Sequence, residues 1–202
     1  MLVGEGPRWD TDYELHLIMA LQNPSHVICP SLNLRECSNV KECIVHSQRV
    51  QKLLNMVLAS VHPLLYASAA EAKAANELQL TEADQYVANL WELVFHGIAV
   101  ISNGTTQHHR DTKGELPWYD ILVSIRTVEN LFLELPELKT QFSYSLWTMV
   151  VLAGHAVSHG VQRWEEGKEH ACWAFFLRAA LFERHGISMP EWPTTSSWLI
   201  PQ

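Results

Sequence analysis

The feature that most constrains the fold of this chain is a change of pattern near Gly97. Before it, residues 38–96 follow helical periodicity, with an Ala-rich segment after His62-Pro63 and an apolar stripe through Val40, Ile44, Leu54 and Leu58. After it come short β-favouring runs at 98–102, 119–125, 131–135, 141–144, 148–152 and 171–178, separated by Gly, Pro, Asn and charged residues. Helices followed by six such runs predict an α+β domain, in which helices pack on one face of a curled antiparallel sheet.

Outside the β-favouring runs, the sequence indicates the secondary structure less strongly. We expect a helix from Ser38 to the His62-Pro63 break, a second over about 64–78, and a short third helix that starts at Thr81, because an acid follows three residues later at Asp84. Residues 1–37 contain several Gly and Pro and are expected to be irregular, apart from a short helix around 13–22. Residues 188–202 are expected to form a C-terminal tail.

The length and composition bound the class of protein. A chain of 202 residues with 48% hydrophobic content predicts a single domain, 1–202, made of the irregular segment 1–37, a helical layer 38–96, a strand core 97–187 and the tail. No apolar run of 18 residues and no basic-then-apolar leader is found, so we expect an intracellular protein without a membrane span. Four cysteines fit reduced thiols, and Cys37, Cys43 and His46 lack the paired spacing of a zinc site.

The formal net charge of −8 argues against nucleic acid as a partner, because Lys and Arg supply most of the non-specific affinity for phosphates. Global charge is not local charge. Six basic residues lie in or near the strand-rich half and could form a local surface for nucleic acid. That they are ordinary solvated side chains is an equally good interpretation. They are Arg110, Lys113, Arg126, Lys139, Arg163 and Lys168.

The run His109-Arg110-Asp111 is followed 48 residues after the Asp by His159 and 19 residues later by Arg178. Two imidazoles and one carboxylate can hold one face of a ferrous ion and leave the other face open. On an extended segment His109 and Asp111 point the same way while His108 and Arg110 point the other way. A His-x-Asp triplet alone is weak evidence for an iron site, so the interpretation depends on the surrounding sequence.

Arg178 ends an apolar strand face formed by Cys172, Ala174 and Phe176. An Arg in this position is costly to bury unless it meets an anion. The distal carboxylate of 2-oxoglutarate fits, because a guanidinium can grip it with two parallel hydrogen bonds.

Three blocks carry a resemblance to a known family. The segment Ile98 to Asp120, with Asn103 and the His109-Arg110-Asp111 run, resembles the iron-binding segment of the Tet/JBP group of 2-oxoglutarate oxygenases, particularly its fungal, transposon-associated branch. Gly154-His-Ala-Val-Ser-His159-Gly160-Val161 resembles the distal-His segment, and the block from Cys172 to Arg184 resembles the closing strand. The chain departs from the family pattern at Ser145-Leu146-Trp147-Thr148, where a Pro-Gly turn is usual, and at Arg126, where Gly is usual.

The resemblance implies a double-stranded β-helix, or jelly roll, over residues 97–187, with an iron site in its mouth. It implies Fe(II) ligands at His109, Asp111 and His159 and a 2-oxoglutarate anchor at Arg178. His155 competes as the distal ligand, Arg163 is the alternative anchor, and Asn103 either helps to bind the cosubstrate or satisfies strand ends.

The activity implied by the resemblance is oxidation of a methyl group on a nucleic-acid base, with dioxygen as the oxidant. The substrates expected are 5-methylcytosine or 6-methyladenine in DNA, with RNA as an alternative, and a nuclear location is favoured over a cytoplasmic one. Two rival functions remain, a 2-oxoglutarate-dependent hydroxylase of a protein or small molecule, and an interaction domain that has lost turnover.

A methylated base must leave the duplex or begin single stranded to reach such a site, and extruded bases commonly stack on aromatic side chains. Trp118, Tyr119, Trp147 and Trp164 are candidates for stacking, with core packing as the alternative. Asp120 could orient an exocyclic amine or simply satisfy a turn.

Overall fold

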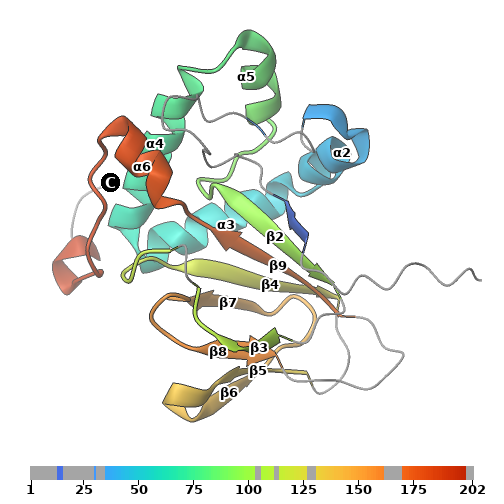
Figure 1. Cartoon of the computed structure of the whole chain (residues 1–202), viewed down its shortest axis with the longest axis vertical. Coiled ribbons are helices and arrows are strands. Elements are labelled where there is room, and N and C mark those ends of the chain that lie inside the picture. Colours follow the sequence, from blue (N-terminus) through green and yellow to red (C-terminus); the bar gives the residue numbers. More distant parts are fainter. Residues whose placement is uncertain are drawn as a thin grey trace, which may run out of the picture.

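The computed structural model describes residues 13–15, 30, 35–102, 106–111, 114–126, 131–161 and 170–198. Figure 1 shows the helices on one side of the molecule and the strands on the other. The helical layer contains α2 (Ser38–His46), α3 (Gln48–Val61), α4 (Pro63–Glu77) and α5 (Glu82–Ala88), and α6 (Ala179–His185) joins it from the other end of the chain. No helix among these residues is long and apolar enough to span a bilayer.

The first expected helix is divided at Ser47, so the prediction of one helix from Ser38 to His62 was wrong. The Ser47 hydroxyl donates to the carbonyl oxygen of Ile44 at 2.9 Å, and the side-chain amide of Gln51 donates to the same carbonyl at 2.9 Å. Side chains that bond to nearby backbone groups compete with the helical ladder. The break at His62 occurs as expected, because Pro63 starts α4 and Nδ1 of His62 accepts from the backbone N–H of Leu65.

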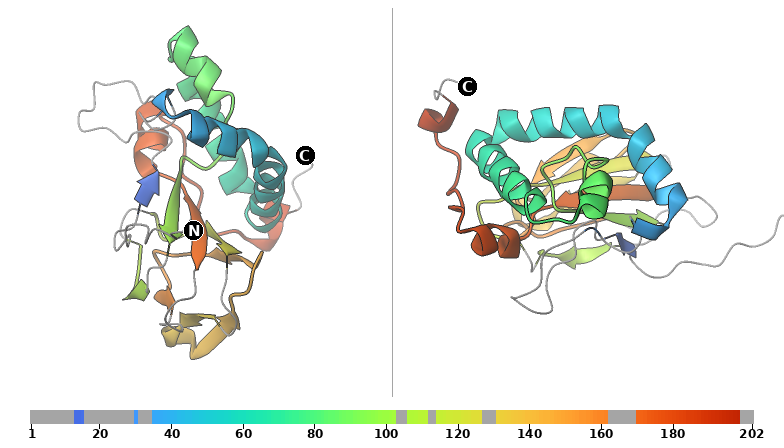
Figure 2. Two further views of the ribbon diagram at one scale, coloured as in Figure 1. Left: turned by 90° about the vertical axis from the view of Figure 1, so that its right-hand side faces the viewer. Right: turned by 90° about the horizontal axis from the view of Figure 1, so that it is seen from above.

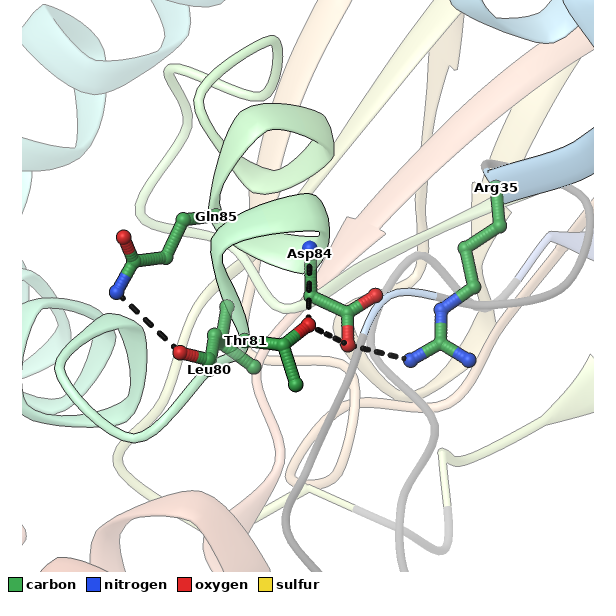
Figure 3. Close-up of polar contacts among 5 residues, drawn as sticks. All are labelled: Arg35, Leu80, Thr81, Asp84 and Gln85. Carbon is green, nitrogen blue, oxygen red and sulfur yellow. Dashed lines mark hydrogen bonds and ion pairs between the residues drawn. The ribbon is translucent and has the colours of Figure 1, made fainter.

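The start of α5 has the predicted cap. The Thr81 hydroxyl accepts from the backbone N–H of Asp84 at 3.2 Å and donates to the Asp84 carboxylate at 3.0 Å (Figure 3). The guanidinium of Arg35 donates to the same carboxylate at 2.8 Å. Gln85 donates from its side chain to the carbonyl of Leu80. These bonds connect the start of the helical layer to α5.

Within the described residues, nine strands form two antiparallel sheets. The first sheet has the order β1-β2-β9-β4-β7 and the second the order β3-β8-β5-β6. The strands are β1 (Tyr13–Leu15), β2 (Gly97–Ser102), β3 (Thr106–His109), β4 (Asp120–Arg126), β5 (Phe132–Leu135), β6 (Thr140–Ser143), β7 (Met149–Leu152), β8 (His159–Val161) and β9 (Ala171–Phe176). From β2 to β9 the chain passes repeatedly between the two sheets, which is the connectivity of a jelly roll. The predicted α+β class and double-stranded β-helix are confirmed.

The N-terminal expectation was partly wrong. A helix was expected around residues 13–22, but Tyr13–Leu15 form a strand that pairs antiparallel with β2, with Tyr13 opposite Val100. The reason lies in the sheet, because the edge of β2 offers unpaired backbone groups that a short extended segment can satisfy. The rest of that predicted helix lies outside the described residues.

Alternating side chains divide the five-stranded sheet into two faces. Residues such as Ile121, Val123 and Phe175 pack with Leu54, Leu58 and Leu65 of the helices in the larger core. Figure 2 shows α3 and α4 covering this face. The other face meets the four-stranded sheet in a smaller core of Leu122, Leu131, Leu133, Leu135, Tyr144, Leu152 and Cys172. The space between the two sheets contains the candidate site.

Candidate metal centre

His109, Asp111 and His159 lie together, each offering one ligand atom, and these atoms all lie within 4.8 Å of one another. Nε2 of His109 is 3.6 Å from Oδ1 of Asp111, and Nε2 of His159 is 3.8 Å from Oδ2 of the same carboxylate. The pairing of β3 with β8 sets His109 opposite His159, with ring centroids 4.5 Å apart. The two sequence segments predicted to hold iron therefore meet through one strand pair.

Backbone bonds set the tautomer of both imidazoles. Nδ1 of His109 lies 2.9 Å from the carbonyl oxygen of Gln107, and Nδ1 of His159 lies 3.1 Å from that of Val157. Because a carbonyl oxygen only accepts, Nδ1 carries the hydrogen in each ring, and the Nε2 lone pairs face the carboxylate. Burial lowers the pKa of His159, which favours the neutral form that a metal ligand requires.

Asp111 is held by the segment that precedes β8. Its backbone N–H donates to the carbonyl oxygen of Gly154 at 3.0 Å. A Cβ atom on Gly154 would lie 2.1 Å from Oδ2 of Asp111 and 2.9 Å from Oδ2 of Asp120. Gly154 is therefore needed because the two carboxyl groups occupy the space in which a side chain would start.

Asp120 lies beside Asp111 and is half-buried. Burial raises the pKa of Asp120 well above its usual range, and the negative charge of Asp111 raises it further. A side-chain hydrogen bond between the Asp120 and Asp111 carboxyl groups raises it as well. Asp120 is thus a neighbour of a candidate metal ligand, a position that neither of its two expected roles, orienting an exocyclic amine or satisfying a turn, had included.

A cavity of about 220 Å³ extends from these residues into the space between the sheets. Its wall is partly apolar, with Leu122 and Leu133 from facing sheets. Cys172, Ala174, Phe176 and Arg178 of β9 and its continuation all line the cavity, as do Phe175 and Leu177. Arg178 is the sole Lys or Arg in this lining among the residues that the structure describes.

Arg178 is positioned through its neighbours. The guanidinium carbon lies 4.2 Å from the centroid of the Phe176 ring, and the backbone N–H of Arg178 donates to Nδ1 of His96 at 2.9 Å. A Cβ atom on Gly97 would lie 2.4 Å from the Phe176 ring, so the absent side chain at 97 leaves room for that ring. His96 is wholly buried, and this burial lowers its pKa to about 3.

Three polar side chains line another part of the cavity. The Tyr144 hydroxyl lies 3.0 Å from Sγ of Cys172, and the rings of Tyr144 and His170 are 5.7 Å apart. Burial raises the pKa of Tyr144, raises that of Cys172 to about 11 and lowers that of His170 to about 4. All three groups are therefore neutral near pH 7, and none of them supplies a charge for an anion.

The remaining predicted residues fall in several places. His155 is half-buried and does not belong to the His109, Asp111 and His159 group. Asn103 and Arg163 lie outside the described residues, as do Lys113, Trp164 and Lys168. His108 points away from the cavity, as its alternation predicts, and its Nε2 lies 2.8 Å from Oε2 of Glu134.

The aromatic candidates divide between core and surface. Trp118 is buried and its ring lies 4.8 Å from that of Phe182, so core packing explains it. Tyr119 makes an edge contact with His62 at 5.5 Å and is also packed against the core. Trp147 is 62% exposed and lies in the turn before β7, where its backbone N–H donates to the carbonyl oxygen of Ser124. None of these three lines the cavity.

Several residues of the site were missed by sequence reasoning. Gly154 was recognised only as part of a family block, while His96, Gly97, Tyr144 and His170 were assigned no role. A lone Gly or His in a sequence does not indicate a functional site, because its importance depends on which residues the fold places against it. The His-rich, Gly-containing spacing 154–160 was the one local pattern that could have directed attention to Gly154.

Comparison with known proteins agrees with the geometry. A family model, Tet/JBP, described as the oxygenase domain of the 2OGFeDO superfamily, matches residues 20–179. Among solved structures, NgTET1 in complex with 5mC DNA is similar over 90% of this chain, with a TM-score of 0.59 and 13% sequence identity. The chain spans 65% of the length of that protein. No curated protein matches the sequence. The structural likeness shows a shared fold.

Proposed function

The chain belongs to the Tet/JBP family of 2-oxoglutarate- and Fe(II)-dependent oxygenase domains, and on this premise we propose that it oxidises a methyl group on a base of DNA. The observation that carries the proposal is the convergence of His109, Asp111 and His159 at one wall of the cavity between the sheets. The fold shared with NgTET1, which was solved with 5mC DNA, supports methylated DNA as the substrate. 5-Methylcytosine and 6-methyladenine are the two bases proposed.

The residues present fit the metal that the family uses. Two neutral imidazoles and one carboxylate form a three-ligand set. Such a set suits ferrous iron, because it would hold one face of the ion and leave its other coordination positions open for other groups. Bound together, iron and 2-oxoglutarate supply the oxidising power for attack on an unreactive methyl group, with dioxygen as the oxidant.

The protein contributes placement, charge and exclusion of water. The carbonyl oxygens of Gln107 and Val157 orient the two imidazoles, and the side-chain hydrogen bond between Asp120 and Asp111 helps to hold the Asp111 carboxylate in place. The apolar walls at Leu122 and Leu133 limit the access of water. We propose that Arg178, the cation of the cavity lining, binds a carboxylate of 2-oxoglutarate.

A second candidate function is supported by charge. The formal net charge is −8, and Arg110, one of the basic residues considered for phosphate contact, forms an ion pair with Glu137. Both facts favour a substrate other than nucleic acid, so hydroxylation of a protein or small molecule is the alternative. The two functions differ in salt dependence, because DNA binding weakens steeply as salt rises.

The test is turnover with defined oligonucleotides. Purified protein with added Fe(II), ascorbate and 2-oxoglutarate is incubated with single-stranded or duplex DNA carrying 5-methylcytosine or 6-methyladenine, and with methylated RNA. Succinate and the oxidised base are measured by mass spectrometry, with Asp111→Ala as the inactive control. We expect succinate and oxidised base in equal amounts from one DNA substrate. Succinate without an oxidised base would favour the alternative, and no succinate from folded, metal-bound protein would favour an interaction domain.

A further inference from the structure

The strand that carries His109 is weakly held by its own sheet. β3 lies at the edge of the four-stranded sheet, and its register with β8 is interrupted between the Thr106 and His109 pairs. Gln107, His108 and His109 are all exposed. An edge strand with an irregular ladder has few backbone bonds to determine where its side chains point. Other contacts must therefore fix the direction of His109 and Asp111.

One such contact crosses the middle of the sheet. Nε2 of His108 on β3 lies 2.8 Å from Oε2 of Glu134 on β5, although β8 runs between these strands. Gly160 of β8 is the register partner of Glu134, and a Cβ atom on Gly160 would lie 2.8 Å from Cδ2 of His108. The missing side chain at Gly160 thus lets two side chains meet across a strand, on the face opposite His109.

A second contact joins both ligand-bearing segments. One carboxylate oxygen of Glu137, in the 3-10 helix η1 (Pro136–Leu138), accepts from the guanidinium of Arg110. Its other oxygen accepts from the backbone N–H of Ser158 at 3.2 Å. Arg110 stands between His109 and Asp111 in the chain, and Ser158 immediately precedes His159. One side chain therefore bonds next to all three candidate ligands.

We propose that Glu134 and Glu137 are positioning residues that hold the three metal ligands in register from outside the cavity. Each carboxylate binds a basic residue next to His109, one on either side of it in the sequence, and Glu137 adds the bond to β8. Neither is in the His109, Asp111 and His159 group or lines the cavity, so both act through His108, Arg110 and Ser158. Exposed ion pairs contribute little to folding, whereas groups that orient metal ligands commonly affect metal affinity by about 10- to 100-fold. The inference rests on the proposed metal site and is independent of the substrate.

The test measures metal affinity and stability separately. Mn(II) is titrated into metal-free protein, and the free ion is followed by its electron paramagnetic resonance signal, while thermal unfolding of the metal-free protein is recorded by circular dichroism. The variants are Glu137→Ala, Glu137→Gln, Glu134→Ala and the double alanine variant. Glu183→Ala is the matched control, because Glu183 is an exposed acid on α6 outside this cluster.

We expect Glu137→Ala and Glu134→Ala each to weaken Mn(II) binding about 10-fold, with unfolding temperatures close to that of the parent. Glu137→Gln keeps an acceptor oxygen and should lose less affinity. Parent-like affinity in the double variant would overturn the proposal, as would an equal loss in Glu183→Ala. If the alanine variants do not fold, Glu137→Gln becomes the deciding variant. A Mn(II) affinity in Glu137→Gln equal to that of the parent would then also contradict the proposal. If the unmodified chain itself fails to bind Mn(II), the metal site of the proposed function is wrong.

Discussion

Gly154 and Asp111 share one small volume, since the Asp111 carboxylate occupies the position where a side chain on residue 154 would begin. Oδ2 of Asp111 would lie 2.1 Å from such a Cβ atom, and the two residues are also joined by a 3.0 Å backbone hydrogen bond. The geometry of the candidate metal group therefore depends on a residue that contributes no side chain.

Gly154→Ala should move the Asp111 carboxylate away from the two imidazoles. We expect Mn(II) affinity to fall at least about 10-fold, with a loss of about 1–3 kcal/mol in unfolding free energy, because the added methyl overpacks a buried site. Gly114→Ala is the control, since its Cβ would meet only Cβ of His155, at an ordinary 3.9 Å. Titration of Mn(II) and chemical unfolding measure the two effects. Unchanged metal affinity in Gly154→Ala would contradict the expected displacement of the Asp111 carboxylate.

Arg178→Met should raise the concentration of 2-oxoglutarate needed for half-maximal succinate production. The methionine keeps an apolar stem against Phe176 but removes the charge, and hydrogen bonds to charged groups contribute about 1.5–3 kcal/mol, which corresponds to about 10- to 100-fold. Mn(II) affinity should stay unchanged. Arg163→Met is compared in parallel. If Arg163→Met raises the requirement and Arg178→Met does not, the anchor is Arg163.

His96 should make the fold sensitive to acid. Its pKa is about 6.5 in an unfolded chain and is lowered to about 3 in the folded protein, first by burial. Folding therefore favours the neutral ring. The stability that the neutral His96 contributes is fully present above pH 6.5 and is lost as the pH falls from 6.5 toward 3. The slope for one such group approaches about 1.4 kcal/mol per pH unit.

His96→Asn tests this assignment. Asn retains a side-chain oxygen that can accept from the backbone N–H of Arg178 but takes up no proton in this range. Urea unfolding at pH 7.5, 6 and 5 should show a shallower loss of stability in the variant than in the parent. An equally steep loss in both proteins would assign the acid sensitivity to another buried ring, with His170 the first to examine.

Trp147 adopts a left-handed backbone conformation, with φ of 63°, in the turn before β7. This conformation costs a non-glycine residue about 1–2 kcal/mol, and the exposed indole gains little from burial in return. Trp147→Gly should therefore be about 1 kcal/mol more stable than Trp147→Ala, which keeps the steric cost. Chemical unfolding of both variants measures the difference. Equal stabilities would show that the turn relaxes to another conformation.

Much of the fold follows from local patterns. The apolar runs that became β2, β4, β5, β7 and β9 were predicted within one or two residues, because strands buried between layers need β-favouring apolar side chains. The helix break at Pro63 and the cap at Thr81 were likewise visible, since both depend on the chemistry of adjacent residues. The division at Ser47 was not predicted, because a hydroxyl that bonds to the backbone is also common within helices.

The ligand-bearing strands carried no such pattern. β3 and β8 are short and rich in His and Gly, so periodicity alone did not reveal them as strands, and only the family resemblance indicated that they belong together. Their pairing depends on groups from elsewhere in the chain, Glu134 and Glu137 among them, that are joined by bonds across 21 to 27 residues of sequence.

By itself, the sequence determined the α+β class, the identity of the buried strands and the residue types suited to hold iron, because these depend on side-chain chemistry and local spacing. Tertiary structure alone decided that His109, Asp111 and His159 face one another, that burial and the charge of Asp111 raise the pKa of Asp120 beside them, and that side chains at Gly154 and Gly160 would displace neighbouring groups. The physical reason is that proximity, burial and steric exclusion arise between segments distant in the chain, and a linear pattern does not encode which atoms compete for the same space.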